Sequence, residues 1–417
     1  MKTTDMNYTP IQLKLPVDME RIIKINDPVY SFSEVMAHID LNKYFVEKEH
    51  ETGRPRYDRE KLLKIVLFAF MEFGYCSVRF IQKLCETDIR FIWILDEDKA
   101  PSHAKIGDFI KGELSTSLDD IFNDINGYMF GKLGVDLNHA YIDGTKIEAN
   151  ANKYTWVWKK SCIKSRNNVF GKLSALLEDI NAYMALYQRA VFEVRQEYAV
   201  EYVEYILGTF LNAAGMTVED FVHGKGKHKT AIQRLYEKVY DCYKKLKSYA
   251  QKIEICGEDR NSYSKTDNDA TFMRFKKDHM KNDQLLPGYN LQMVVCDEFI
   301  AHYGVYAYAS DMDCFQPLME GFKKQYGFYP QYPVADAGYG SYNNYLYCEQ
   351  HGMEKYMKFT MYEKETKESK YRDDPFRSCN FVIDHEGYMV CPNGKRFYFL
   401  RTVPIKGNKF GRMEEHY

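Results

Sequence analysis

The sequence lacks the long apolar runs that membrane proteins need. No stretch of eighteen apolar residues occurs among the 417 residues, so no segment is predicted to span a bilayer. The first residues, Met1 to Asp5, contain none of the apolar region of a secretory signal. We therefore expect a cytoplasmic protein without a membrane partner, long enough for two or three domains.

Paired cysteines and the common nucleotide-binding motifs are also missing. The ten cysteines stand singly, without a C-x-x-C pair or the dense spacing of a secreted disulfide scaffold. Cys379, His385, Cys391 and His416 match no compact zinc pattern. No Walker-type loop, no G-x-G-x-x-G after a strand and no G-x-S-x-G elbow is present. These absences argue against zinc, nucleotide-driven, dinucleotide and hydrolase-elbow chemistry.

A strong net charge is absent as well, since the formal charge is −2. Nucleic-acid binding must therefore depend on local basic patches. Between Gly144 and Lys172, seven basic residues stand against one acidic residue, Glu148, and Trp156 and Trp158 lie in the same segment. Basic residues interleaved with aromatic ones suit phosphate neutralisation and base stacking. A solvated charged face around core tryptophans would show the same pattern.

Two aspartates stand where apolar strands are predicted to end. Asp143 follows the run 138–142, and Asp336 follows Val334 and Ala335; each precedes a glycine-bearing turn. Carboxylate oxygens at the edge of one sheet can hold Mg²⁺ or Mn²⁺, and such ions support phosphodiester cleavage. Each turn alone is weak evidence, because aspartate before glycine is common in ordinary turns.

Helices are predicted over much of the N-terminal third. We interpret residues 1–56 as irregular and residues 57–130 as a helical domain, with one helix from Asp58 to Gly74, a second capped by Ser77 and a third from near His103. This spacing is compatible with a helix-turn-helix DNA-binding module and equally with a plain helical bundle. In a DNA-binding module, basic residues would contact phosphates, among them Arg54, Arg56 and Arg79.

The rest of the chain has the element order of a mixed α/β protein. We assign residues 131–170 and 257–360 to a core of strands and helices, including a hairpin around 296–298 and a helix from Asp311 to Gly327. Apolar residues at three-to-four spacing predict a helical insertion over 171–256. Residues 361–417 are predicted to be rich in strands.

Four motifs resemble bacterial insertion-sequence DDE transposases, specifically those of the insertion sequence 1182 group. They are YIDGTKIEANANKYTWVWKK at 141–160, DHMK and PGYN at 278–281 and 287–290, and ADAGYGS at 335–341. The segment 54–109 is similar to the N-terminal domain that those proteins share. The resemblance runs over nearly the whole chain.

The resemblance implies a ribonuclease-H-like α/β core that uses Mg²⁺ or Mn²⁺ to cut transposon ends and join them to target DNA. Asp143 and Asp336 fall on the first two members of the acidic triad and would be metal ligands. The double-stranded DNA partners would be the terminal inverted repeats and the target. Pairing of two ends implies at least a transient homo-oligomer.

We assign the basic segment beside Asp143 to this DNA. Lys146, Lys153, Lys159 and Lys160 are expected to contact the backbone. Trp156 and Trp158 would stack on DNA or brace the fold.

The third member of the family's triad is a glutamate on a helix near the C-terminus. Five glutamates in the last part of the chain do not stand in that context: Glu349, Glu354, Glu386, Glu414 and Glu415. We therefore expect a C-terminally truncated transposase without an intact active site. The alternative is a non-catalytic DNA-binding remnant or regulator that recognises transposon ends.

Overall fold

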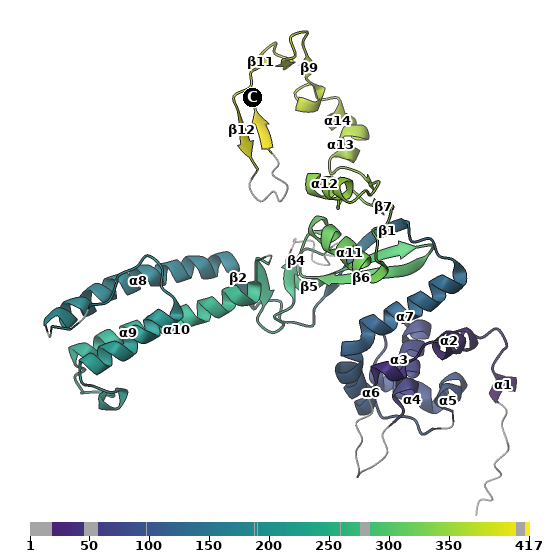
Figure 1. Cartoon of the computed structure of the whole chain (residues 1–417), viewed down its shortest axis with the longest axis horizontal. Helices are drawn as coiled ribbons and strands as arrows, with labels where there is room; N and C mark the ends of the chain where they lie inside the picture. The colour runs from purple at the N-terminus through teal and green to yellow at the C-terminus, as the bar shows by residue number, and fades with distance from the viewer. Residues whose placement is uncertain are drawn as a thin grey trace, which may run out of the picture. The chain divides into compact units, whose positions relative to one another are not determined.

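The computed structural model describes residues 19–45, 57–96, 98–186, 188–189, 191–258, 260–275, 284–405 and 413–417. It divides into two compact units, Met1–Asp136 and Leu137–Tyr417, whose elements are labelled in Figure 1. Arg54, Arg56 and the motif at 278–281 lie outside the described residues.

The first unit is helical throughout its described part. Its elements are α1 (Met19–Ile22), α2 (Pro28–Ala37), the 3-10 turn η1 (Asn42–Tyr44), α3 (Arg59–Phe73), α4 (Val78–Thr87), α5 (Ile89–Leu95), α6 (His103–Phe109), the π-helical turn η2 (Ile110–Leu114) and α7 (Ser115–Leu133). One apolar core joins them, with Leu63, Ile65, Phe68 and Phe91 fully buried.

Side-chain caps fix the helix ends that the sequence predicts. The Asp58 carboxylate accepts hydrogen bonds from the backbone N–H groups of Glu60 and Lys61, at 2.8 and 3.2 Å, and α3 ends before Gly74 at φ 65°. The Ser77 hydroxyl accepts from the backbone N–H of Phe80 at 3.2 Å. Such caps satisfy N–H groups that have no partner inside the helix, so these boundaries are confirmed.

The prediction of an irregular segment over residues 1–56 is wrong for α2. Asp27 caps this helix by accepting from the backbone N–H of Val29 at 3.0 Å, and Pro28 occupies the first helical position, where its missing N–H costs nothing. Val29 and Met36, seven residues apart, are both buried. The cap followed by proline was the signal that the sequence interpretation missed.

The second unit contains a six-stranded mixed sheet. Its strands are β1 (His139–Glu148), β4 (Thr271–Met273), β5 (Leu286–Cys296), β6 (Phe299–Tyr306), β7 (Tyr332–Ala335) and β8 (Tyr356–Met357). β5 pairs antiparallel with β1, β4 and β6, whereas β1, β7 and β8 run parallel. The helices α11 (Asp311–Tyr326) and α12 (Tyr342–Gln350) connect β6 to β7 and β7 to β8. This arrangement confirms the predicted α/β class and the ribonuclease-H-like mixed sheet.

β1 does not end at Asp143 as the sequence predicts. It continues to Glu148, because residues 144–148 pair with residues 288–292 of β5. Only the pairing with β7 stops, after Ile142 and Ala335. Asp143 therefore lies where β1 leaves β7, and the turn expected after it is replaced by an extended strand.

The predicted helical insertion lies between β1 and β4. It consists of α8 (Lys159–Leu186), α9 (Val200–Ala213), η3 (Val218–Asp220) and α10 (Ala231–Cys256). α8 and α10 pack along each other, and α9 packs on α10 (Figure 1). At the base, β2 (Trp156–Trp158) pairs antiparallel with β3 (Ser262–Ser264). The first helix begins at Lys159, earlier than the expected residue 171, because β2 leads directly into it.

The C-terminal segment of the second unit contains short strands, as predicted, together with short helices. Its elements are α13 (Tyr362–Thr366), α14 (Ser369–Arg372), η4 (Ser378–Asn380), β9 (Val382–Ile383), β10 (Met389–Val390), β11 (Arg396–Phe397), β12 (Arg401–Pro404) and β13 (Met413–His416). Across the helices that the structure describes, none has the length and apolar character to cross a membrane.

Candidate functional site

Asp143 and Asp336 lie side by side at one edge of the parallel pair. The β1–β7 register pairs Tyr141 with Val334 and Ile142 with Ala335, so each aspartate is the next residue on its own strand. Both side chains are exposed. Two segments that are almost two hundred positions apart in the chain thus bring two carboxylates to one place on the surface.

A backbone N–H group orients each carboxylate. The N–H of Gly144 donates to Asp143 Oδ1 at 2.7 Å, and the N–H of Gly338 donates to Asp336 Oδ1 at 2.8 Å. Elsewhere in the described ranges, no hydrogen bond to either carboxylate is found. One oxygen of each group is therefore held by the protein, while the other can accept a cation or a proton donor.

A third carboxylate, Asp311 at the start of α11, lies beside this pair. A Cβ placed on Gly338 would be 2.9 Å from Asp336 Oδ1 and 3.8 Å from Asp311 Oδ2. Both carboxylates therefore lie next to Gly338. Asp311 Oδ1 accepts hydrogen bonds from the side-chain amides of Asn290 and Gln292, at 2.8 and 3.2 Å. Sequence reasoning treated Asp311 only as a helix start; its position after the β6 strand and before an apolar helix was the available signal.

Tyr339 lies beneath the three carboxylates and is 1% exposed. Burial, and then the negative charges of Asp311, Asp143 and Asp336, raise the pKa of its phenol well above the ordinary value. The phenol therefore stays protonated and donates to Gln292 Oε1.

The donor chemistry of the site fits a hard divalent cation, although the protein ligands are few. Asp143 and Asp336 offer carboxylate oxygens, which Mg²⁺ and Mn²⁺ prefer. Within the ranges that the structure describes, no group of three or more His, Cys, Asp or Glu side chains is arranged to hold a metal ion. An ion held by Asp143 and Asp336 would therefore need further oxygens from water or from a bound phosphate.

Three of the predicted DNA-contacting lysines already have partners. Lys146 Nζ donates to the backbone oxygen of Arg274 at 3.2 Å, and Lys153 pairs with Glu148 at 2.7 Å. Lys159 Nζ donates to the carbonyl oxygens of residues 257 and 258, at 2.5 and 3.1 Å. Because these carbonyls follow the C-terminal end of α10, Lys159 joins the two ends of the insertion.

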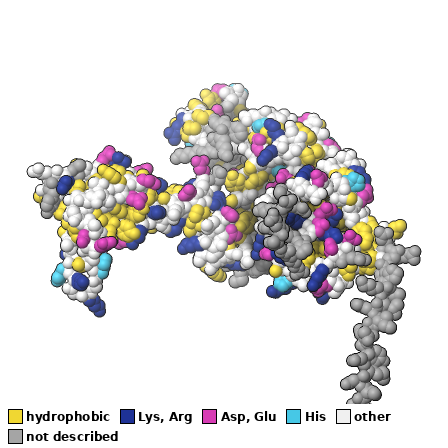
Figure 2. Space-filling model, turned by 60° about the horizontal axis from the view of Figure 1, so that its bottom comes forward, with side chains coloured by type: hydrophobic (Ala, Val, Ile, Leu, Met, Phe, Trp, Pro, Cys, Tyr) yellow, Lys and Arg dark blue, Asp and Glu magenta, His cyan; other side chains and the backbone are white. Residues whose placement is uncertain are grey.

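Lys160 and Arg79 are exposed, Lys160 in the first turn of α8 and Arg79 in the first turn of α4. On the face shown in Figure 2, Lys and Arg side chains are interspersed with Asp and Glu. The view therefore shows local groups of positive charge rather than one broad basic surface.

The two tryptophans of β2 are partly packed and partly exposed. The Trp156 ring meets Phe272 edge-on, with centroids 5.1 Å apart, and lies 6.5 Å from the Trp158 ring. The two residues remain 40% and 36% exposed. They brace the junction between the insertion and the sheet, and enough ring surface stays accessible to meet a base or a sugar.

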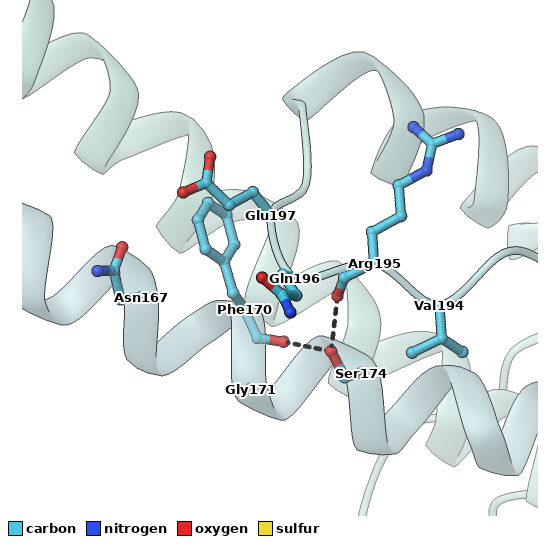
Figure 3. Close-up of a pocket in the computed structure, with 8 residues that line it drawn as sticks. All are labelled: Asn167, Phe170, Gly171, Ser174, Val194, Arg195, Gln196 and Glu197. Atoms are coloured by element: carbon cyan, nitrogen blue, oxygen red, sulfur yellow. Dashed lines mark hydrogen bonds between the residues drawn. The ribbon is translucent and has the colours of Figure 1, made fainter.

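The insertion contains a separate pocket of about 540 Å³ between α8 and residues 194–197 (Figure 3). The Ser174 hydroxyl donates here to the carbonyl oxygens of Phe170 and Arg195, both at 3.1 Å, and lies 2.9 Å from the Tyr198 hydroxyl. These bonds hold the loop onto α8. Glu197 is the one acidic residue lining the pocket, so it lacks the paired carboxylates found at the sheet edge.

Two segments of the chain match known families. Residues 260–389 match a family described as a transposase DDE domain, and residues 17–112 match one described as a transposase domain (DUF772). The first match includes Asp311 and Asp336, whereas Asp143 and the helices α8 to α10 lie outside both. No curated protein and no solved structure matches the chain.

Proposed function

We propose that this chain cuts transposon ends and joins them to target DNA by metal-dependent phosphodiester chemistry. Both of its family matches support a DDE transposase. A transposase DDE domain implies divalent metal use in general, and Mg²⁺ or Mn²⁺ is our assignment. One observation carries the proposal: Asp143 and Asp336 follow the last paired residues of two adjacent parallel strands.

Asp143 and Asp336 are the proposed metal ligands. Their Oδ1 atoms are already oriented by the N–H groups of Gly144 and Gly338, which reduces the reorganisation needed when a cation binds. When bound, the cation would lower the pKa of an attacking water or 3′-hydroxyl and stabilise the leaving oxygen. The chain's own contribution is to hold two carboxylates at a fixed spacing on an exposed edge.

The basic segment that continues from β1 is the proposed path of the DNA backbone. Lys160 is exposed and can meet a phosphate directly. Lys146 and Lys153 would exchange their present partners for phosphate, which costs little for Lys153 because exposed ion pairs are weak. Lys159 would contribute long-range positive charge, and Trp156 and Trp158 offer aromatic faces for stacking.

Recognition of the terminal inverted repeats is assigned to the helical first unit, through Arg79 and through Arg54 and Arg56. Arg79 lies next to the capped start of α4, an arrangement in which N–H groups and a basic side chain can meet phosphate together. Joining two ends to one target requires two bound ends, so we propose a homo-oligomer on DNA.

An end-cleavage assay tests the proposal. The substrate is a labelled linear duplex made from the DNA that flanks the coding sequence, incubated with Mg²⁺ or Mn²⁺ and, separately, with EDTA. Metal-dependent nicking at the element boundary by the wild type, absent in Asp143→Asn, is the expected result. Joined products on added target DNA would extend the activity from cleavage to strand transfer.

Other outcomes reject parts of the proposal. Binding of the boundary DNA without cleavage under any metal condition favours the non-catalytic binder that recognises transposon ends. Cleavage without joined products favours a metal-dependent nuclease. Equal cleavage by the wild type and Asp143→Asn removes Asp143 from the site.

A further inference from the structure

The sheet buries two polar side chains directly behind the candidate site. Asn290 and Gln292 lie on the same face of β5, two residues apart, and both are 0% exposed. Farther along that face, Val294 and Cys296 are buried as well. Burial of an amide is unfavourable unless its hydrogen bonds are satisfied, so this half of the strand needs a specific set of partners.

The Gln292 side chain is fully engaged in such a set. Its Oε1 accepts from the Tyr339 hydroxyl, and its Nε2 donates to Asn290 Oδ1 at 2.8 Å and to Asp311 Oδ1 at 3.2 Å. Asn290 also donates to Asp311 Oδ1, at 2.8 Å, and to the Tyr308 carbonyl oxygen, at 3.2 Å. One buried amide thus connects β5, the start of α11 and the segment after β7.

Gln292 also contacts the residue next to Asp143. It is opposite Gly144 in the β1–β5 register, and a Cβ on Gly144 would be 2.1 Å from Gln292 Nε2. Any side chain at position 144 would therefore displace the amide or the strand. Gly144 is needed here for close packing, and the backbone that follows Asp143 lies directly on the Gln292 side chain.

Tyr339 links the same amide to Asp336. The backbone N–H of Tyr339 donates to the carbonyl oxygen of Asp336 at 3.2 Å, closing the turn after β7. The Tyr339 side chain is buried and ends on Gln292. A shift of the Gln292 amide would therefore move both the strand at Gly144 and the turn after Asp336.

We infer that Gln292 is a positioning residue, which sets the spacing of Asp143 and Asp336 for a divalent cation by packing on Gly144 and accepting from Tyr339. The inference rests on the proposed function, since it assumes that this pair holds a cation. Removing one member of a buried hydrogen-bonded network leaves its partners unsatisfied and lowers stability, so the positioning role is measured as metal binding by the folded protein. Partners that orient metal ligands typically contribute about 10- to 100-fold in metal affinity.

The test compares two buried glutamines in the full chain. Gln292→Met removes the amide and keeps a similar length, and Gln233→Met does the same to an equally buried glutamine of α10, 1% exposed, that bonds to Val222 and Glu237. Mn²⁺ binding to the DNA-free protein is measured by electron paramagnetic resonance, and folding by circular dichroism. We expect Gln292→Met to weaken Mn²⁺ binding about 10- to 100-fold and Gln233→Met to change it by less than about twofold.

Tyr339→Phe provides a second variant that removes a single hydroxyl. It should weaken Mn²⁺ binding by about 2- to 10-fold, the range of one lost hydrogen bond, and it decides the question if Gln292→Met does not fold. If Gln292→Met folds and binds Mn²⁺ as tightly as the wild type, the inference is overturned. If Gln292→Met does not fold, an unchanged Mn²⁺ affinity in Tyr339→Phe overturns it instead. The inference is also overturned if Gln233→Met weakens Mn²⁺ binding as much as Gln292→Met does, or if the wild type does not bind Mn²⁺.

The metal-binding measurement separates this inference from the proposed function. A wild type whose Mn²⁺ binding depends on Asp143 and on Gln292, but which cuts no DNA, keeps the positioning role and rejects the transposase chemistry. A wild type that cuts DNA while Gln292→Met binds Mn²⁺ as well as the wild type keeps the chemistry and rejects the positioning role. Mn²⁺ binding that survives Asp143→Asn unchanged would place the ion elsewhere and reject both assignments.

Discussion

The sheet and the helical insertion of the second unit bury polar side chains to different extents: the sheet buries two linked amides beside the candidate site, whereas the buried side chains of the insertion are mainly apolar. Beneath the candidate site, the sheet buries Asn290 and Gln292. The insertion buries an apolar cluster that includes Leu173, Leu177 and Phe210, all 0% exposed. Apolar packing stabilises many similar arrangements, whereas a buried hydrogen-bonded network is favourable in only one. The contrast suggests that the insertion core supplies stability and the sheet network supplies geometry.

The largest expected effect is at the sheet edge. Asp336→Asn keeps the side-chain shape but removes the charge, so metal-dependent cleavage should fall by more than about 100-fold, because even outer partners of metal ligands contribute about 10- to 100-fold. The melting temperature should change little. The control is Asp297→Asn at the tip of the β5–β6 hairpin, where asparagine tolerates the observed φ of 45°. Full cleavage activity in Asp336→Asn would show that the charge of this carboxylate is not needed at the site.

A substitution in the insertion core should have the opposite effect: it should lower the stability of the protein and leave metal binding unchanged. Leu177→Ala leaves a cavity among buried apolar side chains and should lower the free energy of unfolding by about 2 to 5 kcal/mol. Leu186→Ala, at a leucine that is 79% exposed, should change it by less than about 0.5 kcal/mol. Denaturant unfolding measures both. Folded Leu177→Ala protein should bind Mn²⁺ like the wild type, and weaker binding would show that the insertion core also shapes the site.

A smaller effect is expected where the two regions join. Lys160→Gln should reduce the salt dependence of DNA binding by about one unit of slope, as expected when one phosphate contact is lost. Fluorescence anisotropy at several salt concentrations measures the slope. Lys367→Gln, at an exposed lysine directly after α13, is the matched control. An unchanged slope in Lys160→Gln would remove Lys160 from the proposed DNA path.

The smallest effect concerns the contact between α11 and α12 and depends on pH. A hydrogen bond from Tyr347, supplemented by one from Tyr329, holds the pKa of Glu320 below its ordinary value of 4.5. A lowered pKa in the folded state stabilises the protein above the unfolded value, and this contribution is lost as pH falls through the folded value. Because Glu320 is exposed, the contribution should be below about 1 kcal/mol.

Thermal unfolding of Glu320→Gln and the wild type tests this sign. The wild type should be the more stable protein at neutral pH, and the difference should shrink below pH 4.5. A difference that grows as the pH falls would contradict the assignment of a lowered pKa.

Local signals predicted many element boundaries. The apolar spacing from Asp58, the Ser77 cap and the glycine after α3 marked helix ends because these signals act over three or four residues. The same rule applied to Asp27 and Pro28 would have found α2. These boundaries need no knowledge of distant partners.

The end of β1 and the surroundings of the site could not be predicted in this way. An Asp–Gly pair normally indicates a turn, but at Gly144 the pairing with β5 extends the strand to Glu148. Asp311 looked like an ordinary start of α11, and Gln292 like one polar residue in a strand. Their meeting depends on the register of β5 against β1 and on the packing of α11.

The residue types alone indicated two carboxylates suited to a hard cation, beside a basic segment that contains aromatic residues. Whether those carboxylates meet depended on the parallel pairing of β1 with β7, which joins distant parts of the chain. In our proposal, the rigidity of the pair depends on the buried Gln292 amide, which packs on Gly144 of β1 and accepts from Tyr339 in the turn after β7. The physical reason is range: side-chain chemistry and caps act over a few residues, whereas strand register is a property of the whole sheet.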